Sequence, residues 1–179
     1  MPMSDPVHVT DTGEVAIIAD SHDRQELVTE QAQWLVDNEI DHLIHLGDVR
    51  EAITMRQFAL TGVEIHAVFG NGEIEKDELA GIVDATGGTH HGESAALRIG
   101  ERTFYIHHGV DHGKSYGIAR GHTDIDYVLH GHWHNHEHNV YDNGEVLNPG
   151  SEDIYCYDPY GDTFAHISFE ADKPHASDR

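Results

Sequence analysis

Five short motifs of metal-binding residue types follow one another along the chain, each directly after a segment that reads as a β-strand. Two aspartates, one asparagine and four histidines of these motifs could act as donors. Oxygen and imidazole donors of this kind bind divalent transition metals, and two such ions that share a carboxylate can activate water for hydrolysis. The set therefore predicts one two-metal site made of Asp20-Ser21-His22, Gly47-Asp48, Gly70-Asn71, His108-Gly109 and Gly131-His132-Trp133-His134.

Each motif alone also has a purely structural interpretation. Asp20 and Asp48 precede predicted helices and could cap their N-termini, and the Gly-Asn-Gly sequence at 70–72 is a common turn. The histidine run continues through His136 and His138, so a metal-scavenging strip is a further alternative. Such a strip does not require carboxylates and an amide at distant strand ends, and we therefore favour the two-metal site.

The segments between the motifs alternate between strand and helix patterns. Apolar runs at 15–19, 42–46 and 63–69 predict buried strands, and apolar spacing predicts helices over 24–38 and 51–60. This alternation indicates an α/β layer that binds ligands at the carboxyl ends of its strands. Farther along the chain we predict a helix over 74–82 that ends near Gly81, a hairpin of 95–99 and 103–106, a weak helix over 112–120, and strands at 125–129, 138–141, 145–147, 155–157 and 163–169.

The mixture of elements predicts two sheets packed face to face with helices outside. With 179 residues and no linker or repeat, the chain fits one domain over 14–170. We expect residues 1–13 to be disordered or extended and residues 171–179 to form a frayed tail.

The composition is strongly acidic. Thirty-three Asp and Glu residues face three Lys and seven Arg, and the net charge is −23. Such a surface repels phosphate backbones, so nucleic-acid binding is disfavoured, and it is typical of proteins from a very salty cytoplasm. Cys156 is the only cysteine, which fits a reducing compartment, and no apolar run is long enough for a membrane span. We expect a soluble, cytoplasmic protein and leave a homo-oligomer open.

The five motifs, with Asn148-Pro149-Gly150-Ser151 after them, resemble the calcineurin-like metallophosphoesterase superfamily. The similarity is greatest to the small single-domain bacterial and archaeal phosphodiesterases of the YfcE type, and it spans about residues 14 to 169. The resemblance implies an αββα sandwich of two mixed sheets flanked by helices. It also implies hydrolysis of small phosphoesters by a hydroxide that bridges two divalent metals.

The resemblance assigns the donors to two ions. Asp20, His22 and His134 would hold one ion, Asn71, His108 and His132 the other, and Asp48 would bridge them. The metals of the family are manganese, iron, nickel and zinc, and we expect manganese here. Asp48, Asn71 and His108 would therefore take part in catalysis as well as in metal binding.

One position departs from the family pattern. The superfamily often has His, and this subgroup often Asn, directly after Gly-Asn, whereas this chain has Gly72. That His is the usual candidate for protonating the leaving group. We suggest His112 as a substitute catalytic acid, although an exposed loop histidine is the simpler interpretation.

Four other functions compete with a phosphodiesterase that acts on small substrates. The protein could be a phosphomonoesterase or a nuclease, and the shortage of basic residues disfavours the nuclease. It could also be a non-catalytic scaffold like the retromer subunit of this fold, or a histidine-rich metal binder. The presence of all seven donor positions favours catalysis.

Overall fold

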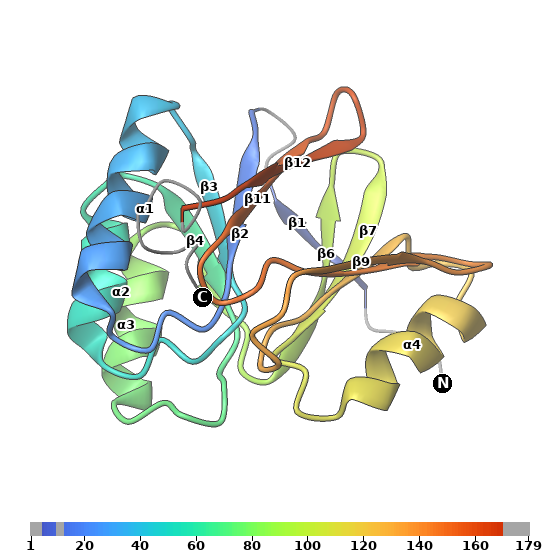
Figure 1. Cartoon of the computed structure of the whole chain (residues 1–179), viewed down its shortest axis with the longest axis horizontal. Coiled ribbons are helices and arrows are strands. Elements are labelled where there is room, and N and C mark those ends of the chain that lie inside the picture. Colours follow the sequence, from blue (N-terminus) through green and yellow to red (C-terminus); the bar gives the residue numbers. More distant parts are fainter. Residues whose placement is uncertain (1–4, 10–12, 170–179) are drawn as a thin grey trace, which may run out of the picture.

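The computed structural model describes residues 5–9 and 13–169, and these form twelve strands and four helices. The strands make two mixed six-stranded sheets that pack face to face, with helices on both outer sides (Figure 1). This architecture is the predicted αββα sandwich. Among the described residues, no helix is long and apolar enough to cross a membrane. The predicted tail at 171–179 lies outside the described residues.

One sheet is built around the parallel strands that carry the first three motifs. Its order is β12-β11-β2-β3-β4-β5, in which β2 to β5 run parallel and β11 is antiparallel to β2. Three helices, α1 (Gln25–Asp37), α2 (Ala52–Ala59) and α3 (Lys76–Ala85), cover its outer face (Figure 1). The strands are β2 (Val15–Ile18), β3 (His42–His45), β4 (Glu64–Ala67), β5 (Thr89–His90), β11 (Ile154–Asp158) and β12 (Thr163–Ile167).

The other sheet has the order β1-β6-β7-β8-β10-β9 and is covered by α4 (His112–Gly121). The predicted hairpin forms its β6–β7 pair, and β7 and β8 run parallel, so their carboxyl ends share one edge. The strands are β1 (Val7–Val9), β6 (Ser94–Ile99), β7 (Arg102–His107), β8 (Tyr127–Leu129), β9 (Glu137–Val140) and β10 (Glu145–Asn148).

Strand β2 shows how the apolar pattern places the sheets. All four of its residues are buried, with Ala16 and Ile18 facing the helices and Val15 and Ile17 facing the other sheet. A strand enclosed on both faces requires a continuous apolar run, which is the pattern seen at 15–19. A third apolar cluster lies under α4 and includes Ile118, Val128 and Val146.

Three elements differ from the prediction. Strand β1 was not predicted, and it pairs in parallel with β6 through Val7, His8 and Val9. Strand β5 has only two residues, too few for an alternation of side chains to be visible. Helix α3 runs to Ala85, so Gly81 lies inside it. The helix continues past Gly81 because Val83, like Leu79, is buried against the sheet.

Candidate metal centre

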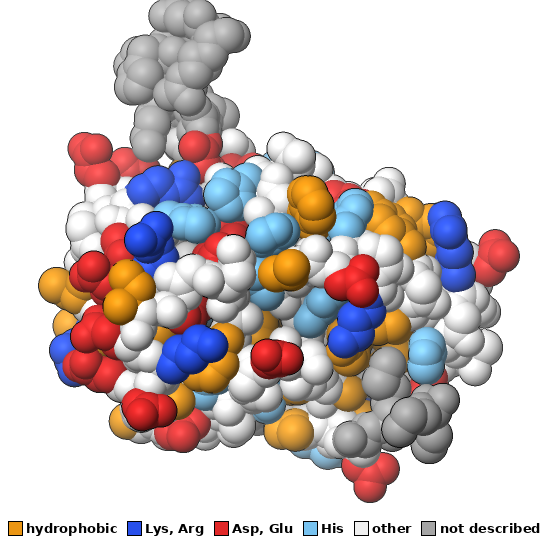
Figure 2. Space-filling view, turned by 90° about the horizontal axis from the view of Figure 1, so that it is seen from below, with side chains coloured by type: hydrophobic (Ala, Val, Ile, Leu, Met, Phe, Trp, Pro, Cys, Tyr) orange, Lys and Arg blue, Asp and Glu red, His pale blue; other side chains and the backbone are white. Residues whose placement is uncertain are grey.

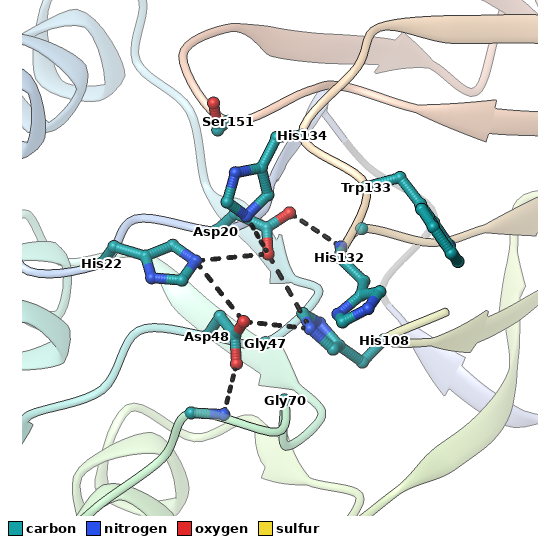
Figure 3. Close-up of polar contacts among 12 residues, drawn as sticks. Asp20, His22, Gly47, Asp48, Gly70, His108, His132, Trp133, His134 and Ser151 are labelled. Atoms are coloured by element: carbon teal, nitrogen blue, oxygen red, sulfur yellow. Dashed lines mark hydrogen bonds and ion pairs between the residues drawn. The ribbon is translucent and has the colours of Figure 1, made fainter. Parts of the chain in front are cut away.

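The donor side chains meet where the loops after five strands converge between the two sheets (Figure 3). Asp20 and His22 follow β2, Asp48 follows β3, and the Gly70-Asn71 pair follows β4. His108 follows β7 and the His132–His134 segment follows β8, both from the other sheet. All seven donors that were predicted from the sequence therefore lie at one place.

The donors fall into two adjacent groups. Asp20, His22 and His134 have ligand atoms close enough together to hold one ion, and Asp48, His108 and His132 form a second such group. The carboxamide Oδ1 of Asn71 lies 3.0 Å from His108 Nε2 and 3.1 Å from His132 Nδ1, so this side chain belongs to the second group.

Two carboxylates lie between the groups. Asp48 Oδ2 is 3.4 Å from His22 Nε2 and 3.2 Å from His108 Nε2, which are donors of different groups. Asp20 Oδ1 is 3.6 Å from His134 Nε2 and 3.8 Å from His108 Nε2 (Figure 3). Asp48 lies nearer to donors of both groups than Asp20 does, so it is the better placed of the two to bridge two ions.

Two buried atoms at the centre indicate that the site is built for cations. Asp20 Oδ1 and His22 Nε2 are buried and have no hydrogen-bond partner among the described residues. Buried polar atoms are nearly always paired, because an unpaired one costs about 1–3 kcal/mol. Both atoms point into the space shared by the donors, so the residues present fit divalent metal ions.

Five of the seven donors have a left-handed backbone conformation. The φ angles are +56° at Asp20, +47° at His22, +60° at Asp48, +70° at His132 and +60° at His134. Residues other than glycine avoid this region, and each such conformation costs on the order of 1 kcal/mol. Strain gathered at one cluster is characteristic of functional sites.

Two motif glycines allow the loops to approach each other closely. A Cβ atom on Gly47 would lie 2.6 Å from the nitrogen of Gly70, and one on Gly70 would lie 2.2 Å from Asp48 Oδ1. Gly47 also has a φ of +97°. Any side chain at these positions would push the loops after β3 and β4 apart and separate Asp48 from Asn71.

The capping alternative for the two aspartates is not observed. The N-cap residues of α1 and α2 are Arg24 and Glu51, and neither makes a side-chain cap hydrogen bond. Asp20 Oδ2 instead accepts a hydrogen bond from the backbone nitrogen of His132 at 2.9 Å. This bond joins the first motif to the last one and leaves Oδ1 facing the donors.

The orientation of His108 is set by a backbone carbonyl. Its Nδ1 lies 2.8 Å from the oxygen of Leu46, which can only accept, so Nδ1 carries the proton. Nε2 is therefore the nitrogen available to a metal, as in many metal sites where a second partner fixes the ligand. The loop at 148–151 also supports the site, because Asn148 Nδ2 donates to the oxygen of Gly131 at 3.3 Å.

Glu73 supports the centre, and we did not single it out from the sequence. Its Oε1 accepts hydrogen bonds from the backbone nitrogens of Asp48 at 2.7 Å and Gly70 at 3.0 Å. Its Oε2 accepts one from the nitrogen of Arg50 at 3.0 Å. The only sequence signal for this role is an acidic residue two positions after Asn71, which many turns share.

The two central carboxyls have different acidities. Desolvation raises the pKa of Asp20 to about 7, and the nearby Asp48 carboxylate adds to this effect. Desolvation also acts on Asp48, but hydrogen bonding and attraction from His108 outweigh it and lower its pKa to about 2. Burial lowers the pKa values of His22, His132 and His134, so these imidazoles are neutral and can donate to a metal.

His112 lies in a neighbouring cluster. It is the first residue of α4, and its Nε2 is 3.1 Å from the Tyr116 hydroxyl and 3.6 Å from Glu137 Oε1. Glu137 also binds the buried His130, with Oε1 2.8 Å from Nε2. The proposed acid role of His112 stays a prediction, and in this structure its partners are Tyr116 and Glu137.

The histidines after His134 do not continue the metal centre. His136 stacks on His166 with ring centroids 4.1 Å apart, and His138 Nε2 lies 3.4 Å from Glu145. Trp133 points away from the donors (Figure 3), and its Nε1 donates to the oxygen of Gly109 at 2.8 Å. The described part of the chain therefore contains a compact centre and no continuous histidine strip.

Comparison with known proteins agrees with the geometry. A family model described as the calcineurin-like phosphoesterase superfamily domain matches residues 14–172. The curated phosphodiesterase MJ0936 of Methanocaldococcus jannaschii is 25% identical over 137 residues, which is 76% of this chain and 82% of that protein.

Solved structures share the fold. An archaeal phosphodiesterase superimposes with a TM-score of 0.79 at 22% identity over 87% of this chain and 99% of the other. YfcE, a phosphoesterase from E. coli, has a TM-score of 0.62 at 14% identity over 87% and 98%. Vps29 of Chaetomium thermophilum has a TM-score of 0.64 at 14% identity over 82% and 85%.

Proposed function

The chain belongs to the calcineurin-like phosphoesterase superfamily, and from this membership we propose that it is a metal-dependent phosphodiesterase that hydrolyses small phosphoesters. The similarity to phosphodiesterase MJ0936 supports a diester as the substrate. A phosphomonoester remains the alternative substrate within the same reaction class.

The observation that carries the proposal is the complete pair of donor groups around Asp48. Asp20, His22 and His134 would hold one divalent metal, and Asn71, His108 and His132 would hold the other. Two such cations supply Lewis acidity that activates water and neutralises charge on the phosphoryl oxygens. A mixed nitrogen and oxygen set favours Mn²⁺ or a similar transition metal over Mg²⁺ or Ca²⁺.

Three residues of the chain would influence how the centre acts on an anionic substrate. Asn71 contributes a neutral oxygen, which limits the negative charge that would repel a phosphate. The proton on His108 Nδ1 is committed to Leu46, so this imidazole holds its orientation throughout turnover. Gly72 offers no side chain beside Asn71, so the leaving group depends on its own acidity, on solvent or on a more distant acid such as His112.

Two observations separate this function from its alternatives. A scaffold of the same fold has no need for buried unpartnered donors and five strained donor residues, and both are present here. The fold itself does not decide between them, because Vps29 shares it. A nuclease is disfavoured because ten basic residues face 33 acidic ones.

Hydrolysis of methyl 4-nitrophenyl phosphate and of 4-nitrophenyl phosphate after metal removal and reconstitution tests the proposal. We expect release of 4-nitrophenolate to require Mn²⁺ or a similar metal, to favour the diester, and to be lost in Asp48→Ala. His122→Ala, a histidine outside both donor groups, is the matched control and should keep full activity. Metal binding without turnover would support a scaffold or a simple metal binder instead.

A further inference from the structure

A pocket of about 360 Å³ opens beside the second donor group. Asn71 and His108 are among the residues that line it, and Phe69 and Val110 add an apolar surface. The pocket lies between the loop after β4 and the start of α4. A substrate whose phosphate is at the metal centre can therefore extend its organic part into this space.

Two lysines line this pocket. The whole chain contains only three lysines, and the third, Lys173, lies outside the described residues. Lys76 begins α3 and Lys114 lies in the first turn of α4, about forty residues apart in sequence, yet both border the same space. In a chain of net charge −23, this placement of both described lysines beside the metal centre indicates a site for an anion.

Neither lysine is neutralised by a carboxylate of the described chain. No described ion pair includes Lys76 or Lys114. Their ammonium groups lie instead over aromatic rings, Lys76 at 5.1 Å from the Phe69 centroid and Lys114 at 5.3 Å from that of Tyr105. These contacts orient the side chains while leaving the ammonium hydrogens available to a ligand.

Two of the arginines differ from these lysines. Arg56 and Arg102 form ion pairs with acidic side chains, at 2.5 Å to Glu78 and at 2.8 Å to Asp162. Figure 2 shows the face seen from below, where histidines gather near the middle and blue and red side chains are interspersed around them. The two lysines of the pocket differ from these two arginines in having no carboxylate partner among the described residues.

The acidic residues of the pocket limit which ligands fit. Asp111 is the N-cap of α4, and its Oδ1 accepts from the nitrogen of Lys114 at 3.3 Å, so one oxygen is already engaged. Glu93 is exposed at the rim. A ligand must therefore place its negative charge near both lysines and away from Glu93, which favours a compact terminal anion over a long polyanion.

We propose that this pocket binds a second anionic group of the substrate, so that the preferred substrates are small phosphodiesters with a further terminal phosphate or phosphonate-like group. The inference rests on the proposed phosphodiesterase function. In the reaction, water adds to phosphorus at the metal centre, the ester P–O bond breaks, and the alcohol leaves with a proton. The second anion is unchanged and serves only to position the substrate.

A pair of inhibitors, one without and one with a second anion, tests the proposal. Methyl phosphate and 2-phosphonoethyl phosphate are compared as competitive inhibitors of methyl 4-nitrophenyl phosphate hydrolysis, at the lowest KCl that keeps the protein folded. Homologues in which three or four carbons separate the phosphate from the phosphonate test longer distances across the pocket. We expect at least one homologue to have an inhibition constant about tenfold below that of methyl phosphate, since charge-assisted hydrogen bonds are roughly twice as strong as neutral ones.

Variants of the two lysines test whether their side chains bind the second anion. Lys76→Met and Lys114→Met should each weaken the phosphonate inhibitor about fivefold, near the upper end for an exposed ion pair, without changing inhibition by methyl phosphate. Lys76→Arg and Lys114→Arg should keep most of the affinity for the phosphonate inhibitor. Arg120→Met is the matched control, because Arg120 is on α4 beside Tyr141 and outside the pocket, and it should have no effect.

The outcomes separate this inference from the function on which it rests. If methyl 4-nitrophenyl phosphate is not hydrolysed with any metal, the proposed function fails, and calorimetric titration of the same ligand pair still tests the pocket. Equal binding of all homologues and methyl phosphate overturns the inference alone. An equal effect of Arg120→Met and the lysine variants would also overturn it, because net charge would then explain the binding.

Discussion

The carboxylate of Glu73 accepts a hydrogen bond from the backbone nitrogen of Asp48 at 2.7 Å, across the gap between the loops after β3 and β4. The same oxygen accepts from Gly70 at 3.0 Å. Glu73 thus holds Asp48, the proposed bridging residue, and the asparagine loop in one arrangement. It touches no donor atom, and we regard it as a positioning residue.

Glu73→Ala should weaken metal binding by roughly tenfold, the lower end for the loss of an outer-shell partner. Glu73→Gln keeps one acceptor oxygen and should recover part of the affinity. Glu75→Ala is the control, because Glu75 makes the same kind of bond to the nitrogen of Ala52 at 3.0 Å, at the start of α2. Competition with a metal-binding dye measures all three affinities, and equal losses in the two Ala variants would disprove a special role for Glu73.

Asp48→Ala should cause more damage than His22→Ala, because Asp48 Oδ2 faces donors of both groups. We expect Asp48→Ala to lose both metals and His22→Ala to lose mainly one. Elemental analysis after equilibrium dialysis gives the number of metals per chain. Loss of a single metal in both variants would contradict the bridging assignment.

The rate should depend steeply on the acidity of the leaving group, because Gly72 provides no acid beside Asn71. Gly72 does not have a positive φ, and a Cβ atom there would lie 3.1 Å from Asp48 Oδ1, so a small local shift would admit a side chain. Gly72→His should therefore raise alkyl-ester turnover more than aryl-ester turnover, within the roughly 10²–10⁴-fold range of acid catalysis. Gly72→Ala controls for the local shift.

A series of methyl aryl and methyl alkyl phosphates measures this dependence. His112→Ala should be measured with the same substrates, because His112 was the predicted substitute acid. A flat dependence on leaving-group pKa, with His112→Ala unchanged, would show that protonation is not rate-limiting.

The metal-free protein should lose stability as the pH falls below 6.5, because His45 is buried and neutral. Desolvation lowers its pKa to about 3, and Ser21 Oγ lies 2.8 Å from its Nε2. The unfolded chain binds a proton near pH 6.5 while the folded chain does not, so the free energy of unfolding falls by at most about 2 kcal/mol between pH 6.5 and 5 from this residue. Urea unfolding at both pH values, for the wild type and His45→Gln, measures the difference. If the free energy of unfolding falls by the same amount between pH 6.5 and 5 in the wild type and in His45→Gln, His45 is not the source of the pH dependence.

Stability should rise with KCl into the molar range, because the net charge of −23 penalises the compact state and salt screens this repulsion. Thermal unfolding from low to molar KCl measures the effect, with NaCl as the ionic-strength control. A melting temperature that falls or stays constant would refute the interpretation of a salt-adapted surface.

Much of the fold could be predicted from the sequence. The run at 15–19 predicts a strand enclosed on both faces, because two apolar layers leave no polar position in it. The predicted metal ligands were recognisable because polar residues directly after buried strands interrupt a strong apolar pattern. The family and the αββα architecture followed from these local signals, and the family match and the structure confirm both.

Other features were decided only by the tertiary structure. Strands β1 and β5 exist through pairing with β6 and β4, and their own residues are too few to show a period. Glu73 acts through backbone nitrogens of another loop, and Lys76 and Lys114 share a pocket because α3 and α4 begin on either side of it. The sequence by itself determined which residues have the chemistry to bind metal. The packing of two sheets determined which of the remaining charges lie beside them, because contacts between residues far apart in the chain arise only when the strands assemble.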